Sequence, residues 1–347
     1  MANFLYFLFF VLLTIAPLQR AHSQIRSADS TYFQNQLASF AKGNNLRRFN
    51  FIKKFPKKNN LSNLQVKTQG IDWLGLYRNV IVEKKGRTDS IVYIVCHYDK
   101  IDGNIFSFVN LMINGSLDIL FSNTFLTKGA YDNGTGVATL LGLLEWIDSR
   151  PTYYTYRFLF AGMEEYGLRG SRRHVSSLTS KEWSKCVYAI NIDMIAEKKF
   201  KGITVTVDVS DYRLVKTAER ITERNGQELT KAFLPAGALS DFHSFRGQSF
   251  TKDFGISFMA NVVGAFIPQR SYFTKGKSAI PVINFSDDTQ FGTGDMVSIF
   301  SPVSFGTVHS LNDRIKRVSA NNLVEYSEFF KHFITSIDEA QSLGTPD

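Results

Sequence analysis

Two histidines and three acidic residues that can bind a metal ion follow one another along the chain. They are His97, Asp132, Glu165, Asp193 and His309. Imidazole nitrogens combined with carboxylate oxygens suit zinc-like ions, whereas calcium takes oxygen ligands only. Five ligands are enough for a pair of ions, and paired ions about 3.5–4 Å apart activate water for hydrolysis. The ordered set therefore predicts a two-metal hydrolytic site.

Each of these residues lies at or just beyond the end of an apolar run that is typical of a β-strand. The runs are IVYIVCHYD (91–99), GAYDNGTGVA (129–138), YRFLFAGMEE (156–165), VYAINIDM (187–194) and SFGTVHSLND (304–313). In open α/β sheets, ligands bind beyond the carboxyl ends of the strands. The position of the five residues therefore agrees with a shared site.

Strand-like runs alternate with segments of helical periodicity along the rest of the chain. Strands are predicted at 79–86, 89–96, 156–161, 187–193, 203–207 and 279–285, the first two joined by a Lys-Gly-Arg turn. Helices are predicted at 31–46, 134–149, 167–178, 212–225 and 321–337. This alternation predicts an α/β fold with a mixed, mainly parallel central β-sheet and helices on both faces.

The amino terminus is almost wholly apolar from Phe4 to Ala16. A spanning helix needs about 20 apolar residues, so this shorter run is typical of a secretory signal peptide. The small residues Ala21 and Ser23 predict cleavage near Ser23/Gln24, with a retained N-terminal anchor as the alternative. We therefore expect a signal peptide over 1–23, a secreted or periplasmic protein, and no stable membrane span after signal removal.

The remaining residues, 24–347, are expected to form a single catalytic domain. The chain has 347 residues, is 44% hydrophobic, and has no Pro/Gly/Ser-rich linker that would divide it. Cys96 and Cys186 are predicted to be free, buried thiols, because they lie at opposite ends of their strands. Basic residues exceed acidic ones by nine, but they are scattered rather than interleaved with aromatic residues, so no nucleic-acid partner is expected.

The motifs CHYD, GAYDNGTGVA, AGMEEYGLRGS, NIDM and HSLND, taken in this order, resemble those of the M28 family of zinc aminopeptidases, which also contains the glutaminyl cyclases. The resemblance covers roughly residues 79–313 and implies a zinc-peptidase (phosphorylase/hydrolase-like) fold. It implies two Zn²⁺ ions, one held by His97 and Asp193 and the other by Glu165 and His309. Asp132 would be the carboxylate that bridges both ions.

The resemblance also implies roles for two further acidic residues. Glu164 precedes the metal ligand Glu165, and it would take a proton from the metal-bound water and deliver it to the leaving amine. Asp99 lies two residues after His97, on the same face of an extended segment, and it would accept the free ring N–H of His97. Glu164 and Asp99 are therefore the predicted catalytic pair.

Two positions differ from the pattern that is common in the family. In the run Ser240-Asp241-Phe242-His243, the imidazole stands one residue later than usual, so His243 is left out of the ligands and is a candidate for lining the substrate pocket. Lys100 follows CHYD where a serine is common. This second difference leaves the charge of the substrate pocket open.

The function that these features predict is an exported di-zinc aminopeptidase, which hydrolyses the N-terminal peptide bond of peptides with a free N-terminus. One alternative is a glutaminyl cyclase-like aminoacyltransferase, slightly favoured by the lysine after CHYD. Another is a non-catalytic binding relative, which would be expected to have lost ligands or Glu164. Carboxypeptidase or dipeptidase action is a further alternative.

Overall fold

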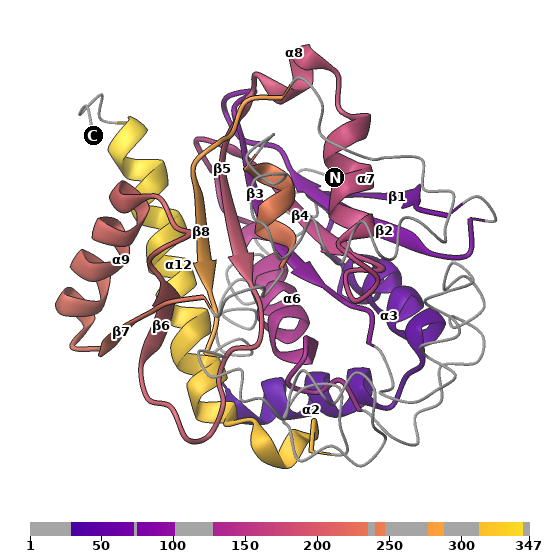
Figure 1. The fold of residues 1–347 in the computed structure, drawn as a ribbon, viewed down its shortest axis with the longest axis vertical. Helices are drawn as coiled ribbons and strands as arrows, with labels where there is room; N and C mark the ends of the chain where they lie inside the picture. Colours follow the sequence, from indigo (N-terminus) through magenta and orange to yellow (C-terminus); the bar gives the residue numbers. More distant parts are fainter. Residues whose placement is uncertain are drawn as a thin grey trace, which may run out of the picture.

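The protein is built on one eight-stranded sheet with the strand order β1-β2-β4-β3-β5-β8-β6-β7 (Figure 1). The computed structural model describes residues 29–72, 75–100, 128–234, 240–246, 277–287 and 312–342. The strands are β1 (Leu64–Gly70), β2 (Arg78–Lys84), β3 (Ile91–His97), β4 (Thr155–Ala161), β5 (Cys186–Ile192), β6 (Ile203–Thr206), β7 (Leu229–Ala232) and β8 (Val282–Phe285). Four of the seven strand pairs in this part of the chain are parallel. The predicted mixed, mainly parallel sheet is confirmed.

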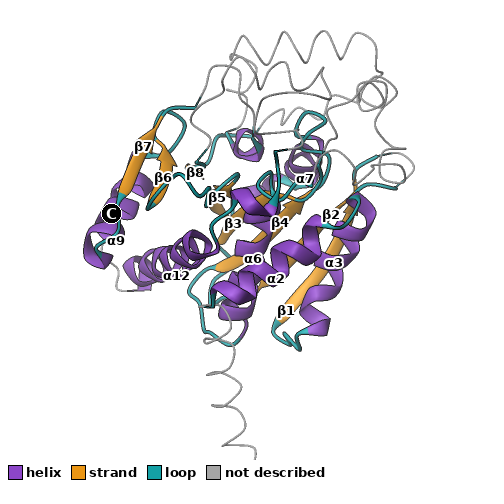
Figure 2. Cartoon of the chain, turned by 90° about the horizontal axis from the view of Figure 1, so that it is seen from below, coloured by secondary structure: helices purple, strands orange, loops and turns teal. Residues whose placement is uncertain are grey.

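Helices cover both faces of this sheet. The helices are α2 (Ser30–Ala41), α3 (Asn45–Lys58), α6 (Gly134–Asp148), α7 (Arg169–Ser177), α8 (Ser180–Trp183), α9 (Tyr212–Asn225) and α12 (Ala320–Ser342). Figure 2 shows α12, α6, α2 and α3 along one face, where they pack on strand residues such as Val92 and Phe160. Helices α7 and α8 and the 3₁₀ helix η1 (Asp241–Phe245) cover the other face, against Tyr93 and Leu159.

The sequence pattern of the central strands follows from this two-sided cover. Successive side chains of a strand point to opposite faces, and here both faces are buried, so every residue of β3 is buried. An edge strand has no such requirement. Most of β1 is exposed, and its polar sequence LQVKTQG did not predict a strand.

Two local predictions differ from the structure. The helix predicted at 31–46 is two helices, because α2 ends at Ala41 and the Asn44 side chain caps α3 by accepting the N–H of Arg47 at 2.9 Å. The strands joined by the Lys-Gly-Arg turn, β2 and β3, are not neighbours, since β4 lies between them. The link between them bonds instead to the segment before β4, through the N–H groups of Arg87 and Thr88.

Other predictions concern the cysteines, membrane spans and chain organisation. Cys96 and Cys186 are free and buried, as predicted. No helix in the described ranges has the length and apolar character needed to cross a membrane. The signal peptide lies outside the described residues, and both it and the single catalytic domain over 24–347 stay predictions.

Candidate metal centre

Three neighbouring parallel strands bring most of the predicted site together. His97 is the last residue of β3, Glu164 and Glu165 follow β4, and Asp193 follows β5. Because β3 pairs in parallel with both β4 and β5, the carboxyl ends of all three strands meet at one edge. Asp132 lies two residues before α6. His309 lies outside the described residues.

The imidazole of His97 lies between two carboxylates. Its Nε2 atom is 3.0 Å from Asp132 Oδ1 and 3.3 Å from Asp193 Oδ1. A carboxylate oxygen of Glu165 joins the group, since ligand atoms of His97, Asp132 and Glu165 lie within 4.8 Å of one another. His97, Asp132 and Asp193 are all buried, and Glu165 is partly buried. Four of the five predicted ligands therefore converge, and their role as metal ligands stays a prediction.

The spacing of these donors fits a zinc ion. Zinc–nitrogen and zinc–oxygen bonds of about 2.0–2.2 Å in a tetrahedral arrangement place neighbouring donor atoms roughly 3.3–3.6 Å apart. The distances from His97 Nε2 to Asp132 Oδ1 and Asp193 Oδ1, 3.0 and 3.3 Å, are close to this range. The oxygen Oδ1 of Asp193 is buried and has no hydrogen-bond partner among the described residues. A buried acceptor of this kind needs a cation or a donor, which either zinc or the protonated imidazole of His97, 3.3 Å away, would supply.

The loop before α6 is fixed against β5 by Asn133. Its Oδ1 accepts the N–H groups of Gly136 and Met194, at 3.0 and 3.2 Å, and its Nδ2 donates to Ile192 O at 2.9 Å. A Cβ atom at Gly136 would lie 2.5 Å from Asn133 Oδ1 and 2.7 Å from Ile192 O, so the close approach needs glycine. Asn133 thereby sets Asp132, its neighbour in the chain, beside Asp193.

Asp99 holds the segment that carries the two glutamates. It is fully buried, and its carboxylate accepts the backbone N–H of Glu164 at 3.1 Å and that of Glu165 at 3.3 Å. The Asp99 Oδ1 atom is 3.7 Å from His97 Nδ1, which is an ion-pair separation and too long for the hydrogen bond that the sequence predicted. Asp99 is therefore a positioning residue for Glu164 and Glu165.

The electrostatics of the cluster reflect an excess of carboxylates. Burial alone would lower the pKa of His97, but Glu164, Asp193 and Asp132 raise it well above its usual value. Burial raises the pKa of Glu164 well above its usual value; His97 opposes that rise and Glu165 adds to it. The partly buried guanidinium of Arg172 lies near Glu164 and Asp241, and with His97 it offsets part of this negative charge.

Two residues that the sequence did not assign to the site adjoin it. The Ser240 hydroxyl donates to Asp193 Oδ2 at 2.7 Å and accepts from Asn191 Nδ2 at 2.7 Å, so it orients the carboxylate of Asp193. Asp241 is buried, and burial raises its pKa to about 7, with the nearby charge of His97 opposing the rise. The run Ser240-Asp241 directly before Phe242 was the sequence signal for these two residues.

The two positions that depart from the family pattern are both buried. The His243 ring stacks on Phe242 with 4.1 Å between centroids, and its Nδ1 lies 3.1 Å from Ser240 O. Its place as a wall of the substrate pocket stays a prediction. Lys100 is fully buried, and its backbone N–H and C=O both bond to the side chain of Asn45, at 3.1 Å each.

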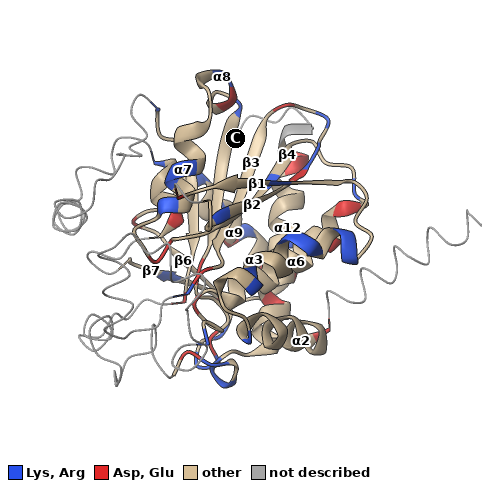
Figure 3. Ribbon diagram, turned by 90° about the vertical axis from the view of Figure 1, so that its right-hand side faces the viewer, with Lys and Arg blue, Asp and Glu red and all other residues tan. Residues whose placement is uncertain are grey.

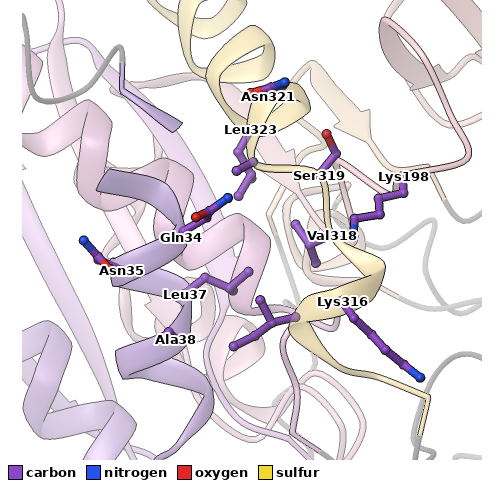
Figure 4. A pocket seen from close by; sticks show the side chains of 12 residues that line it. Gln34, Asn35, Leu37, Ala38, Lys198, Lys316, Val318, Ser319, Asn321 and Leu323 are labelled. Atoms are coloured by element: carbon purple, nitrogen blue, oxygen red, sulfur yellow. The ribbon is translucent and has the colours of Figure 1, made fainter. Parts of the chain in front are cut away.

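A separate groove of about 550 Å³ lies between α2 and the segment that leads into α12. Figure 4 shows residues of α2, such as Leu37, on one side, and Val318, Ser319 and Lys198 on the other. None of the predicted site residues lines this groove. It is therefore distinct from the metal centre.

The sequence model of Peptidase family M28 matches residues 79–334. The chain belongs to peptidase family M28. The matched range includes every residue predicted for the metal centre, His309 among them. The resemblance inferred from the sequence motifs is confirmed.

Known M28 proteins match this chain over part of their length. Aminopeptidase YwaD of Bacillus subtilis (strain 168) is 28% identical over 137 residues, which cover 39% of this chain and 25% of that protein. The solved structure of a zinc aminopeptidase from Bacillus subtilis superposes with a TM-score of 0.50 at 20% identity, over 75% of this chain and 50% of that chain. The match thus spans about a quarter of the length of Aminopeptidase YwaD and about half of the length of the solved zinc aminopeptidase chain.

A second solved structure matches over nearly its whole length. A glutaminyl cyclase from an Acidobacteriales bacterium has a TM-score of 0.60 at 18% identity, and the match covers 89% of this chain and 94% of that one. At such identities the likeness establishes the fold. The M28 fold predicted from the sequence is therefore confirmed, and the activity is argued from the site.

Proposed function

We propose that this M28 chain is a zinc-dependent aminopeptidase that hydrolyses the N-terminal peptide bond of peptides. The observation that carries the proposal is the convergence of His97 Nε2, Asp132 Oδ1 and Asp193 Oδ1, with separations of 3.0 and 3.3 Å from the imidazole. These distances suit zinc, and Glu164 lies beside the cluster in position for acid–base work. A non-catalytic relative would be expected to lack metal ligands or Glu164. All the predicted ligands in the described residues, and Glu164, are present.

The ligand set supports two zinc ions. His97 and Asp193 would hold one ion, Glu165 and His309 the other, and Asp132 would bridge them. Glu165 supports the second position because its carboxylate lies within reach of the same cluster. Bound zinc would polarise the scissile carbonyl and lower the pKa of the attacking water.

Glu164 would carry out the proton transfer that hydrolysis requires. Glu164 is buried, and its raised pKa brings it closer to neutrality, where a general base is most effective. Its carboxylate would take a proton from the attacking water and pass it to the leaving amine. Asp99 would fix the position of Glu164 through the backbone N–H bond at 3.1 Å.

The charge of the site supports a substrate with a free amino terminus. The carboxylates of the site outnumber its described cations, His97 and Arg172, so part of the negative charge would remain after zinc binds. Glu164 and Asp241 belong to this excess. A peptide ammonium complements such a surface electrostatically, whereas a peptide carboxylate would be repelled. This argues for aminopeptidase rather than carboxypeptidase action.

The deciding experiment is a panel of aminoacyl chromogenic substrates assayed with and without a chelator, beside a cyclisation assay on peptides with N-terminal glutamine. We expect release of the chromophore, its loss with chelator, and its return on addition of zinc. N-terminally acetylated substrates serve as the control, because they lack the ammonium. Cyclisation without hydrolysis would replace the proposal with the glutaminyl cyclase alternative. Absence of both activities in the zinc-loaded protein would favour a binding relative.

We also propose that the enzyme is exported, because the apolar run at its amino terminus predicts a signal peptide. Mass spectrometry of the mature amino terminus tests this. A start near Gln24 would support it, whereas an intact Met1 in the cell fraction would contradict it.

A further inference from the structure

Helix α3 precedes the range that the M28 family model matches, 79–334. Two of its residues nevertheless reach loops that carry predicted metal ligands. We propose that Arg48 of α3, together with Asp313, positions the loop before Asp132 for zinc binding. The inference rests on the proposed zinc site, and it assigns part of the site's scaffold to a helix outside the matched range.

Arg48 joins two ligand-bearing segments. Its guanidinium is fully buried and donates to Tyr98 O at 3.1 Å, between His97 and Asp99 in the chain. It also donates to Gly129 O at 2.9 Å and to Lys128 O, just ahead of Asp132. One planar group with several fixed donors therefore links the end of β3 to the loop before α6.

Asp313 holds the same loop from its other side. Its Oδ1 accepts the N–H groups of Ala130 and Tyr131, at 2.9 and 2.7 Å. The carbonyls of the loop thus face a cation and its N–H groups face an anion. Burial and the nearby carboxylate of Asp132 raise the pKa of Asp313 to about 7, and the Tyr131 N–H and the charge of Arg48 oppose that rise. The peptide groups of residues 128–131 lie between the guanidinium of Arg48 and the carboxyl group of Asp313, each of which stabilises the orientation that the other requires.

The fit between Arg48 and the loop leaves no room for a side chain. Gly129 has φ +56°, in the left-handed region, and a Cβ atom there would collide with the guanidinium. A second contact from α3 supports the same arrangement, because Asn45 bonds to both backbone groups of Lys100, one residue after Asp99. Helix α3 therefore contacts both loops through buried polar groups.

The contrast within α3 supplies a matched control. Figure 3 shows Lys and Arg along this helix. Arg47 is exposed, and its backbone N–H donates to Asn44 Oδ1 at 2.9 Å. Arg47→Met and Arg48→Met make the same chemical change at neighbouring positions. They differ in whether the guanidinium faces water or the two loops.

The test measures zinc affinity by competition with a chromogenic chelator, and thermal unfolding of the zinc-free protein. Loss of residues that orient metal ligands typically weakens metal binding by about 10–100-fold. We expect Arg48→Met to show a loss of this size, Arg48→Lys a smaller one, and Arg47→Met none. If Arg48→Met fails to fold, Arg48→Lys probes the same contact with less disruption, because it keeps a cation and a donor at this position. A folded Arg48 variant with unchanged zinc affinity would overturn the inference.

A double-variant cycle tests the cooperation of the two charges. Asp313→Asn keeps an oxygen for the N–H groups of Ala130 and Tyr131 but removes the charge, so we expect weaker zinc binding. The double variant Arg48→Met/Asp313→Asn should lose less affinity than the product of the two single losses, because both act on one loop. Fully multiplicative losses would show independent action and contradict the proposed cooperation. If the unaltered protein binds no zinc, the proposed function fails and the inference fails with it, whereas zinc binding that is insensitive to these variants rejects the inference alone.

Discussion

Strand β3 contributes to two buried polar clusters of opposite character. At its carboxyl end, His97 lies among carboxylates at the candidate metal centre. Four residues earlier, and on the same face, Tyr93 belongs to a network in which Arg157 Nη1 donates to the tyrosine oxygen at 2.9 Å and Arg157 Nε donates to Glu83 Oε2 at 2.9 Å. The Tyr93 hydroxyl lies 3.0 Å from His174 Nε2. Both clusters are rich in titratable groups, but they differ in charge balance.

The network around Tyr93 satisfies its own charges. Arg157 pairs with Glu83, and burial, assisted by the charge of Arg157, lowers the pKa of His174 to about 3, so this imidazole is neutral. In the metal centre the pKa of His97 is raised instead, and the carboxylates outnumber the two described cations near them, His97 and the partly buried guanidinium of Arg172. A balanced buried cluster stabilises the fold, whereas an unbalanced one requires a cation from outside. This difference in charge balance agrees with the proposed metal site around His97.

Removal of the proposed bridging carboxylate should have the largest effect on the metal centre. We expect Asp132→Ala to lose bound zinc and all measurable hydrolysis, because this residue would contact both ions. Elemental analysis of protein purified without chelator should approach two zinc equivalents for the unaltered chain and fall well below that for the variant. An unaltered chain that holds one equivalent, whatever the amount of zinc added, would contradict the two-ion site.

Changing Glu164 should separate chemistry from metal binding. Glu164→Gln keeps the shape of the side chain but cannot take the proton, so kcat should fall by about 10²–10⁴-fold. Zinc content should stay that of the unaltered protein. A near-normal kcat, measured on the best substrate of the panel, would remove Glu164 from the mechanism.

The balanced cluster should respond in stability rather than in zinc binding. Glu83→Gln leaves the partly buried charge of Arg157 without its ion-pair partner, and loss of a hydrogen bond to a charged group typically costs about 1.5–3 kcal/mol in the free energy of unfolding. Urea titration measures this loss, and zinc affinity of the folded variant should be unchanged. A variant that unfolds normally but binds zinc poorly would erase the distinction between the two clusters.

The smallest expected effect is a pH dependence from His174. The folded pKa of about 3 lies below the unfolded value of about 6.5, so the unfolded chain binds more protons between these pH values. This contribution to stability is complete above about pH 6.5 and is lost at roughly 1.4 kcal/mol per pH unit as the pH falls toward 3. His174→Gln should reduce the slope of unfolding free energy against pH between 6.5 and 5. An unchanged slope would show that His174 is not held neutral.

Much of the site could be predicted because its ligands follow strands whose apolar sequences are distinctive. His97, Glu165 and Asp193 each end or follow a buried run, and parallel pairing carries such ends to one edge. The buried His174 network escaped prediction, since a histidine on α7 facing Tyr93 looks in sequence like any helix residue. The polar edge strand β1 escaped for a related reason, because an exposed strand needs no apolar pattern.

The sequence by itself determined the order of ligand types, the alternation of strands and helices, and hence the family and the edge of the sheet where the site lies. Tertiary structure decided which polar groups hold those ligands in place. Arg48 and Gly129 are 81 residues apart, and Tyr131 and Asp313 are 182 apart. Local propensity and periodicity act over a few residues, and so they carry no record of such partners. These contacts form only when α3 and the segment before α12 pack against the 128–131 loop.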